Sequence, residues 1–316
     1  MAKYYNQKYW VLGGIMKQEI TRKMVEMALI LKEFNGKTEQ TVVPQEKSKL
    51  SKVFKHVYCC NYEMNVLKCV KKDSYYRDLL KGHGGELRSS KIGSAPKFNS
   101  IISSAALVVN TFAPWKDHLG DLTVEVNGNA FSNFISMEFE YIAKTKNNSF
   151  PNLDVWLENN TEVLAIECKF CEFLGNNNYK KLQGSYRNII KQEGYTGTWI
   201  DIINAVTDSS GKGIYQYFDV VQIIKHYFGI INCNKPEKNL IYLYWHPENK
   251  DWNKIHPYDV LEKELEDFSQ KVSGATDVHF YYLNFNDLWN QWESNQKEHI
   301  DMLRDKYSVC INPEED

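Results

Sequence analysis

One stretch, PNLDVWLENNTEVLAIECKF at residues 151–170, constrains this chain more than any other. It contains two short apolar runs joined by an Asn-rich turn, a pattern typical of a β-hairpin. Three charged residues, Asp154, Glu167 and Lys169, interrupt the apolar runs. Burying a charge is costly unless another group pairs with it. The hairpin therefore indicates a place where these charges meet one another or a ligand.

Side-chain alternation along the strands predicts how the three charges are arranged. Glu167 and Lys169 are two residues apart, so they point to the same face of their strand. A turn centred near residues 160–161 places Asp154 across from Glu167. Two carboxylates this close repel each other, and one of them takes up a proton unless a cation lies between them.

Two interpretations of the trio are open. In the first, the two carboxylates hold Mg²⁺, which prefers oxygen ligands and takes further contacts from a substrate phosphate. The lysine then orients a water molecule or stabilises developing negative charge. In the second, Asp154, Glu167 and Lys169 form only a local salt bridge at the edge of a sheet. A carboxylate-x-lysine sequence alone is common, and its place in a hairpin with a facing aspartate favours the metal site.

The arrangement PNLD, then 12 residues, then ECK resembles the signature of the PD-(D/E)XK nucleases, the restriction-endonuclease-like superfamily. The resemblance implies that Asp154 and Glu167 are the catalytic, metal-binding acids and that Lys169 is the catalytic lysine. It also implies that the backbone carbonyl of Cys168 is a metal ligand. One departure exists, because two residues separate Pro151 from Asp154 where the signature has none.

The same resemblance suggests further site residues. Many members carry an upstream acid, and Glu140, nearer the hairpin than Glu138, is the predicted one; a solvated strand residue is the alternative. The helix expected at 98–113 offers no acid, only Asn110. Some members place a glutamine on the helix after the hairpin, and Gln222 fits better than Gln216. His226, one turn further on, is expected either to face phosphate or to be a packing residue.

The order of predicted elements gives the fold class. From residue 98 the pattern predicts a helix, three consecutive strands, a long helical connection and a fourth strand parallel to a neighbour. This is an α/β protein with a central mixed sheet, and the resemblance implies a three-layer α/β/α core of the restriction-endonuclease type. The segments are helix 98–113, strand 133–145, the hairpin, helices 178–193 and 214–230, strand 239–247, helix 258–272, strand 278–283 and helix 286–305.

A glycine-rich stretch at 82–96 is the predicted boundary between a mostly helical N-terminal region, 1–95, and a nuclease domain, 96–316. A loop within one domain is the alternative. Within the first region, 19–34 has a helical apolar stripe, and 45–81 is Lys-rich with interleaved aromatic residues and is expected to be helical. Residues 1–100 hold 19 Lys and Arg against 9 Asp and Glu, whereas the remainder holds 19 against 31. A DNA-binding part and a merely solvated basic face are both consistent with this imbalance.

The cysteine count and the apolar runs indicate the cellular compartment that we expect for this chain. The chain has seven cysteines, an odd number without a framework spacing, which indicates reduced thiols of a cytoplasmic protein. Cys168 and Cys171 lack the second pair that zinc would need, so structural thiols are expected. No apolar run is long enough for a membrane span, and the first residues lack the pattern of a signal peptide.

The predicted function is hydrolysis of DNA, expected to be double-stranded, by an endonuclease that uses Mg²⁺, with Mn²⁺ as a substitute. The sequence contains no GxxxxGK[ST] motif of an ATPase. A stand-alone enzyme of restriction or phage defence is therefore expected, and a homodimer is an arrangement that the sequence permits. The alternatives are a catalytically inactive DNA-binding protein with this fold and a repair or RNA-processing nuclease of the same superfamily. A hydrolase of another phosphoester would need a closed small-molecule pocket instead of a basic groove.

Overall fold

The computed structural model describes residues 11–12, 15–16, 19–34, 42–44, 57–59, 61–81, 85–88, 95–145, 150–175, 181–193 and 195–311. The strands are β1 (Val11–Leu12), β2 (Ile15–Met16), β3 (Val42–Pro44), β4 (Val57–Cys59), β5 (Val124–Val126), β6 (Asn129–Phe131), β7 (Ser136–Ile142), β8 (Asn152–Glu158), β9 (Glu162–Lys169), β10 (Glu237–Tyr244) and β11 (His279–Asn284). The α-helices are α1 (Arg22–Phe34), α2 (Tyr76–Lys81), α3 (Ser104–Phe112), α4 (Gly184–Glu193), α5 (Thr198–Val206), α6 (Val220–Ile230), α7 (Tyr258–Val272), α8 (Phe285–Trp292) and α9 (Lys297–Tyr307). Short 3₁₀ helices include η2 (Tyr62–Asn65), η3 (Lys72–Ser74), η4 (Lys97–Asn99) and η5 (Ala113–Asp117).

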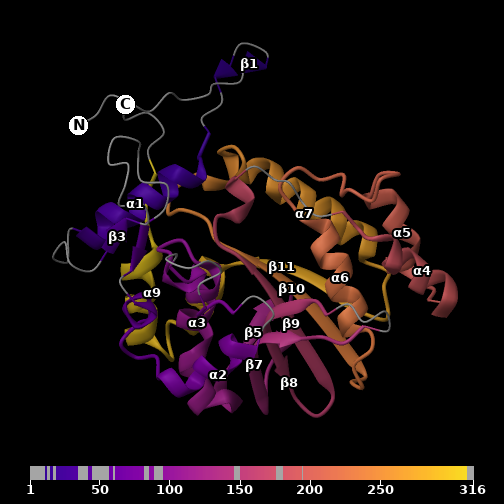
Figure 1. Ribbon diagram of the computed structural model, residues 1–316, viewed down its shortest axis with the longest axis horizontal. Helices are drawn as coiled ribbons and strands as arrows, with labels where there is room; N and C mark the ends of the chain where they lie inside the picture. The colour runs from indigo at the N-terminus through magenta and orange to yellow at the C-terminus, as the bar shows by residue number, and fades with distance from the viewer. Residues whose placement is uncertain are drawn as a thin grey trace.

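A five-stranded mixed sheet forms the centre of the molecule, in the order β11-β10-β9-β8-β7. Strands β7, β8 and β9 form an antiparallel meander, whereas β10 is parallel to both β9 and β11. Helices α6 and α7 lie on one side of the sheet, and α3 and α9 lie on the other (Figure 1). The predicted fold class, a restriction-endonuclease-like α/β sandwich around a mixed sheet with a helical N-terminal part, is confirmed.

The hairpin of β8 and β9 has the predicted register. Its ladder pairs Val155 with Ile166 and continues to Glu158 and Val163. Asn159 closes the turn, since its Oδ1 accepts the N–H groups of Thr161 and Glu162 at 3.0 and 2.9 Å. An asparagine side chain that binds the backbone two or three residues ahead is a standard way to fix a tight turn. This turn therefore sets which residues of the two strands lie opposite each other.

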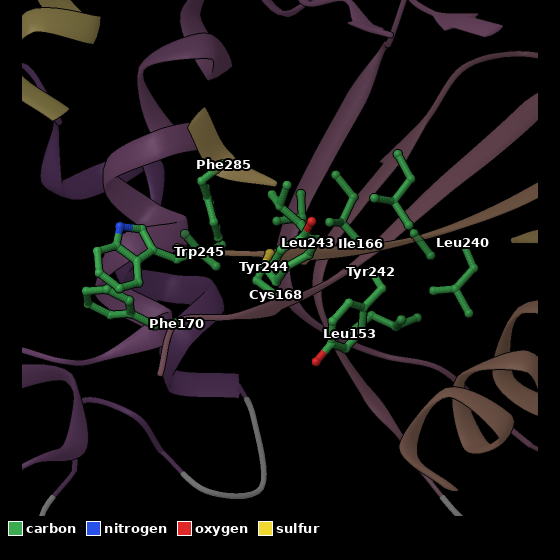
Figure 2. Packing of buried hydrophobic residues seen from close by; sticks show 14 of the residues in the cluster. Leu153, Ile166, Cys168, Phe170, Leu240, Tyr242, Leu243, Tyr244, Trp245 and Phe285 are labelled. Atoms are coloured by element: carbon green, nitrogen blue, oxygen red, sulfur yellow. The ribbon is translucent and has the colours of Figure 1, made fainter. Parts of the chain in front are cut away.

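Strands β9 and β10 are buried on both faces because helices cover both sides of the sheet. Phe170 and Trp245 follow these strands and pack edge to face, with ring centroids 5.0 Å apart. Figure 2 shows both rings in one cluster with Cys168, Leu243 and Phe285. Central parallel strands of this kind are typically apolar throughout. Polar residues on the opposite face of β9 therefore need specific partners.

Helix α6 begins later than predicted, at Val220 instead of residue 214. The carboxylate of Glu264, on α7, accepts the N–H groups of Gln216, Tyr217 and Phe218 at 2.6, 2.9 and 2.9 Å. These contacts hold the segment in a non-helical conformation, and Asp219 then caps the helix by accepting the N–H of Gln222 at 3.0 Å. Tertiary contacts thus override the apolar periodicity at 214–219.

The predicted single helix at 286–305 is wrong, because the chain forms two helices, α8 and α9, with a break at 293–296. Asn295 and Gln296 both donate to the carbonyl of Trp292, which ends α8 in a turn. Trp292 itself donates through Nε1 to the carbonyl of Thr123 at 2.7 Å. Helix α5, between α4 and α6, was not predicted.

The helical prediction for 45–81 is partly wrong. Residues 45–56 lie outside the described residues, and 57–59 form strand β4, which pairs with β3. The rest is η2, η3 and α2, separated by turns. Asn65 is buried and donates through Nδ2 to the carbonyls of Phe98 and Ser100 at 2.7 and 2.8 Å. Such side-chain bonds to distant backbone groups compete with continuous helix.

Asp78, on α2, links this part of the chain to the outer edge of the sheet. Its Oδ2 lies 2.7 Å from Nζ of Lys116 and accepts the backbone N–H of Phe139, in β7, at 3.2 Å. At the N-terminal side, Lys32 of α1 donates to the carbonyls of Arg304 and Ser308 at 2.8 and 2.6 Å. The described residues before and after residue 95 therefore contact each other, and a domain boundary there stays a prediction. Of the helices described, none is both long enough and apolar enough to cross a membrane.

Candidate active site

Asp154 lies where the hairpin strands stop pairing. The β8–β9 ladder ends at Val155 and Ile166, and one step further the backbone N–H of Cys168 donates to Oδ2 of Asp154 at 2.7 Å. A side-chain carboxylate thus takes the place of a backbone acceptor. The N–H and C=O of one residue in an extended strand point to the same edge. The carbonyl of Cys168 therefore points to the edge of β9 that faces Asp154.

Glu167 is buried, with 2% of its side chain exposed, and a side chain lies close to each of its oxygens. Its Oε1 accepts from Nζ of Lys169 at 2.5 Å, and its Oε2 lies 2.8 Å from Nε2 of His226. The second contact is short, but the ring is not aligned for a hydrogen bond. Burial acts to raise the pKa of Glu167, but the charges of Lys169 and His226 outweigh it and lower the pKa to about 2.

Lys169 joins the hairpin to helix α6. Its Nζ donates to Oε1 of Gln222 at 2.8 Å in addition to Glu167. Burial acts to lower the pKa of Lys169, but Glu167, Glu172 and Asp154 raise it above its ordinary value. The lysine is therefore an ammonium group at neutral pH. Such a group stabilises negative charge but cannot accept a proton from water.

Glu140 lies across from Asp154 on the neighbouring strand, since β7 pairs with β8 on both sides of this position, at Phe139–Val155 and Tyr141–Leu153. Its backbone has φ of +49°, a left-handed conformation that is uncommon for a residue other than glycine. Strain of this kind in mid-strand concentrates at functional sites. The structure thus brings Glu140 to the same end of the sheet as Asp154 and Glu167.

Nearby positive charge neutralises the carboxylates of Glu140 and Asp154 only in part. The pKa of Glu140 is raised to about 7 by burial and by the charges of Glu86 and Glu167, while the Asn152 side chain and the charge of Lys97 act to lower it. The pKa of Asp154 is raised well above its usual range by burial and by the charges of Glu167 and Glu140. A carboxylate cluster of this kind binds either a proton or a cation.

The donor chemistry at this site suits Mg²⁺, which takes oxygen ligands from carboxylates and backbone carbonyls. Asp154, Glu167 and the Cys168 carbonyl are the groups that could hold it. Across the residues that the structure describes, however, no three Asp, Glu, His or Cys side chains already converge as a metal-binding group. Both oxygens of Glu167 have close contacts with Lys169 and His226. A metal would therefore compete with contacts that the chain makes itself.

Glu138 and Gln216, the alternatives to Glu140 and Gln222, have partners outside the charged trio. Glu138 is 3.5 Å from Nζ of Lys81, and Gln216 donates through its side chain to the hydroxyl of Tyr217 at 2.9 Å. Asn110 is buried away from the site, where its side chain bonds to Leu67, Asn65 and Tyr307.

Cys168 and Cys171 are both buried, and burial raises the pKa of each thiol well above its usual range. Figure 2 shows the Cys168 side chain in the apolar cluster. Both side chains therefore pack in the hydrophobic core.

Sequence reasoning missed three polar residues of this region. Asn152 is two residues before Asp154, and its side chain acts to lower the pKa of Glu140; strand alternation could have found it. Asp219, the N-cap of α6, lies close enough to Lys169 and Glu167 for their charges to affect its pKa, which is raised mainly by burial. An aspartate just before a helical pattern is a capping signal. Glu86, whose charge acts on Glu140, lies within the glycine-rich stretch at 82–96 and carries no local signal.

The fold and the site together define a protein of the PD-(D/E)XK nuclease type: a mixed sheet between helices, with two acids and a lysine at the end of the central hairpin. A family model described as "Restriction Endonuclease associating with ARP" (REase-ARP) matches residues 31–308. The chain therefore belongs to this family of restriction endonucleases. No curated protein and no solved structure matches it.

Proposed function

We propose that this protein is an endonuclease that hydrolyses phosphodiester bonds of double-stranded DNA with Mg²⁺, for which Mn²⁺ can substitute. One observation carries the proposal. The ammonium group of Lys169, whose side chain is 16% exposed, donates to Glu167 and Gln222, and beside it the carboxylate of Asp154 accepts a backbone N–H of the sheet. A purely structural salt bridge would not account for the further carboxylates of Asp154 and Glu140 crowded against it. Membership of a restriction endonuclease family supports this assignment.

Each residue has a role that follows from its surroundings. Asp154, Glu167 and the Cys168 carbonyl would hold the metal, which supplies a charge that acidifies water and neutralises phosphoryl oxygens. Lys169, kept protonated by Glu167, stabilises negative charge on the phosphate and orients water through N–H donation. Gln222 fixes the ammonium group from the side of α6. Glu140 adds negative charge next to Asp154 and so increases the affinity for a cation.

The basic N-terminal part is the proposed contact surface for DNA. In the described residues, Lys72 lies over the rings of Tyr62 and Tyr76, with Nζ 5.3 and 4.8 Å from their centroids. Lys72 is half exposed, so it can reach a phosphate from this position. Basic residues clustered on one face are typical of nucleic-acid-binding surfaces.

The family is described as associating with ARP, and we propose that this protein likewise acts together with an ARP partner, in restriction or in phage defence. A homodimer is the alternative arrangement.

A cleavage assay tests the proposed chemistry. Supercoiled DNA, linear DNA, single-stranded DNA and RNA are each incubated with the protein in Mg²⁺, in Mn²⁺ and in EDTA. We expect cleavage of duplex DNA with either metal and none in EDTA. Binding of DNA without cleavage under all conditions would instead favour an inactive DNA-binding protein, and cleavage of RNA alone would favour an RNA-processing nuclease.

A further inference from the structure

Helix α6 presents two polar residues, Gln222 and His226, to the face of β9 that carries the site. They are four residues apart, so they lie on the same face of the helix one turn apart. Gln222 accepts from Lys169, and His226 contacts Glu167. One helix thus contacts both charged residues of the ECK sequence.

A histidine at position 226 that served only for packing would lower the stability of the fold. Its side chain is 2% exposed and lies among buried apolar residues of α6, including Ile223 and Tyr227. Both of its ring nitrogens are buried, and neither has a hydrogen-bond partner in the part of the chain that the structure describes. An unpaired buried polar atom destabilises a fold, and an apolar side chain of similar size would avoid the cost. The close contact of Nε2 with Glu167 gives a reason for a histidine at this position.

The position of His226 is fixed by contacts on both ends of α6. Near the start, Asp219 caps the helix and Glu264 holds the three preceding N–H groups. Near the end, Gly229 lies so close to residues 143 and 151 that an added Cβ would be 2.5 Å from Cβ of Ala143. The helix therefore has little freedom to shift or rotate, and the imidazole stays where Glu167 meets it.

We propose that His226 is a positioning residue for Glu167. Its Nε2 lies against Oε2 and limits rotation of the carboxylate, so that Oε1 remains beside Lys169 and a metal that displaces these contacts meets the group in one orientation. The inference rests on the proposed function, because it assigns Glu167 to the metal. Groups that orient metal-binding side chains commonly change metal affinity or activity by about 10- to 100-fold when they are removed.

The experiment compares His226→Leu, His226→Gln and a matched control, His299→Leu. His299, on α9, is also a buried helix histidine; its Nε2 contacts the carbonyl of Asn110 at 2.8 Å, and its Nδ1 has no hydrogen-bond partner among the described residues. Calorimetry measures Mn²⁺ affinity without DNA, thermal unfolding measures stability, and steady-state cleavage of a plasmid separates kcat from KM.

We expect His226→Leu to lower Mn²⁺ affinity by about tenfold or more and to reduce kcat with little change in KM. His226→Gln, whose amide keeps a polar group beside Oε2 of Glu167, should recover most of the affinity. His299→Leu should change stability only. Equal Mn²⁺ affinity of His226→Leu and wild type would overturn the inference, and so would tighter binding, which would mean that His226 competes with the metal. A wild type that neither binds Mn²⁺ nor cleaves would instead contradict the proposed function.

Discussion

The side chain of Asp154 and the backbone of Cys168 are joined by a 2.7 Å hydrogen bond, in which the Cys168 N–H donates to Oδ2. The bond occurs one step beyond the last paired residues of the hairpin, Val155 and Ile166. Asp154 therefore has two roles. Its side chain accepts a backbone N–H of β9 where the backbone pairing of β8 with β9 has ended, and its charge lies beside Glu167. The two roles can be separated by substitution.

Asp154→Asn separates them because the amide oxygen still accepts the Cys168 N–H while the charge is removed. We expect calorimetry to show loss of Mg²⁺ and Mn²⁺ binding. The melting temperature without metal should stay the same or rise, because repulsion with Glu167 and Glu140 disappears. Asp117→Asn, which removes an exposed partner of Lys71, is the control and should leave metal binding unchanged. Metal affinity that survives in Asp154→Asn would remove this residue from the metal site.

Lys169 is proposed to act on the phosphate and the attacking water, and its substitution tests catalysis apart from binding. Lys169→Ala should reduce the cleavage rate by about two orders of magnitude or more, the scale of losing one electrostatic stabiliser, with little change in DNA affinity. Lys169→Arg should recover little activity, because a planar guanidinium cannot replace a compact ammonium bonded to Glu167 and Gln222. A folded Lys169→Ala protein that cleaves at the wild-type rate would contradict this mechanism.

The stability of the metal-free protein should depend on pH through Glu140. Its pKa is raised to about 7, so the folded state binds a proton more tightly than the unfolded state. Stability from this group is present at low pH and is lost as pH rises from about 4.5 to 7. Glu140→Gln should remove that loss, which is on the order of 1–3 kcal/mol because the residue is partly exposed. Denaturant unfolding at pH 5 and pH 7.5 measures it, and a wild type whose stability rises between these values would contradict the assignment.

The opposite dependence is expected from Glu167. Its pKa is lowered to about 2, so its contribution is present above about pH 4.5 and is lost as the pH falls toward 2. The two carboxylates therefore limit stability from opposite sides of the pH scale. Glu167→Gln should weaken acid sensitivity and should reduce the loss above pH 5 only in part, because burial and Glu86 still raise the pKa of Glu140. Unfolding curves between pH 3 and 7.5 distinguish the two variants.

The sequence predicted those parts of the structure that depend on local pattern. Alternation and an Asn-rich turn were enough for the β8–β9 register, and apolar periodicity predicted α7 at its observed bounds. The β5–β6 hairpin was missed although it carries a strong local signal, Asn127-Gly128, with φ of +51° and +78°. The left-handed backbone of Glu140 and the contact between His226 and Glu167 depend on packing between distant segments. No local pattern encodes them.

The proposed DNA surface is tested by salt dependence. Phosphate contacts release counterions, so affinity for duplex DNA should fall steeply as salt rises. Deletion of the N-terminal part is a poor test, because Tyr75 stacks on Phe98 and Asp78 binds the edge of β7. Charge removal at exposed lysines, in the double variant of Lys71→Gln and Lys72→Gln, leaves this packing in place.

We expect the double variant to bind more weakly at low salt and to have a shallower salt slope, by about one unit for each lysine–phosphate interaction that the substitutions remove. Fluorescence anisotropy at 50–300 mM salt measures the slope, and Lys297→Gln, an exposed lysine on α9, is the matched control. The pairing of Lys71 with Asp117 and of Lys72 with Glu63 must be broken when DNA binds, so each lysine contributes less than a free one. An unchanged slope in the double variant, with binding still sensitive to salt, would place the DNA contacts on other cations of the chain.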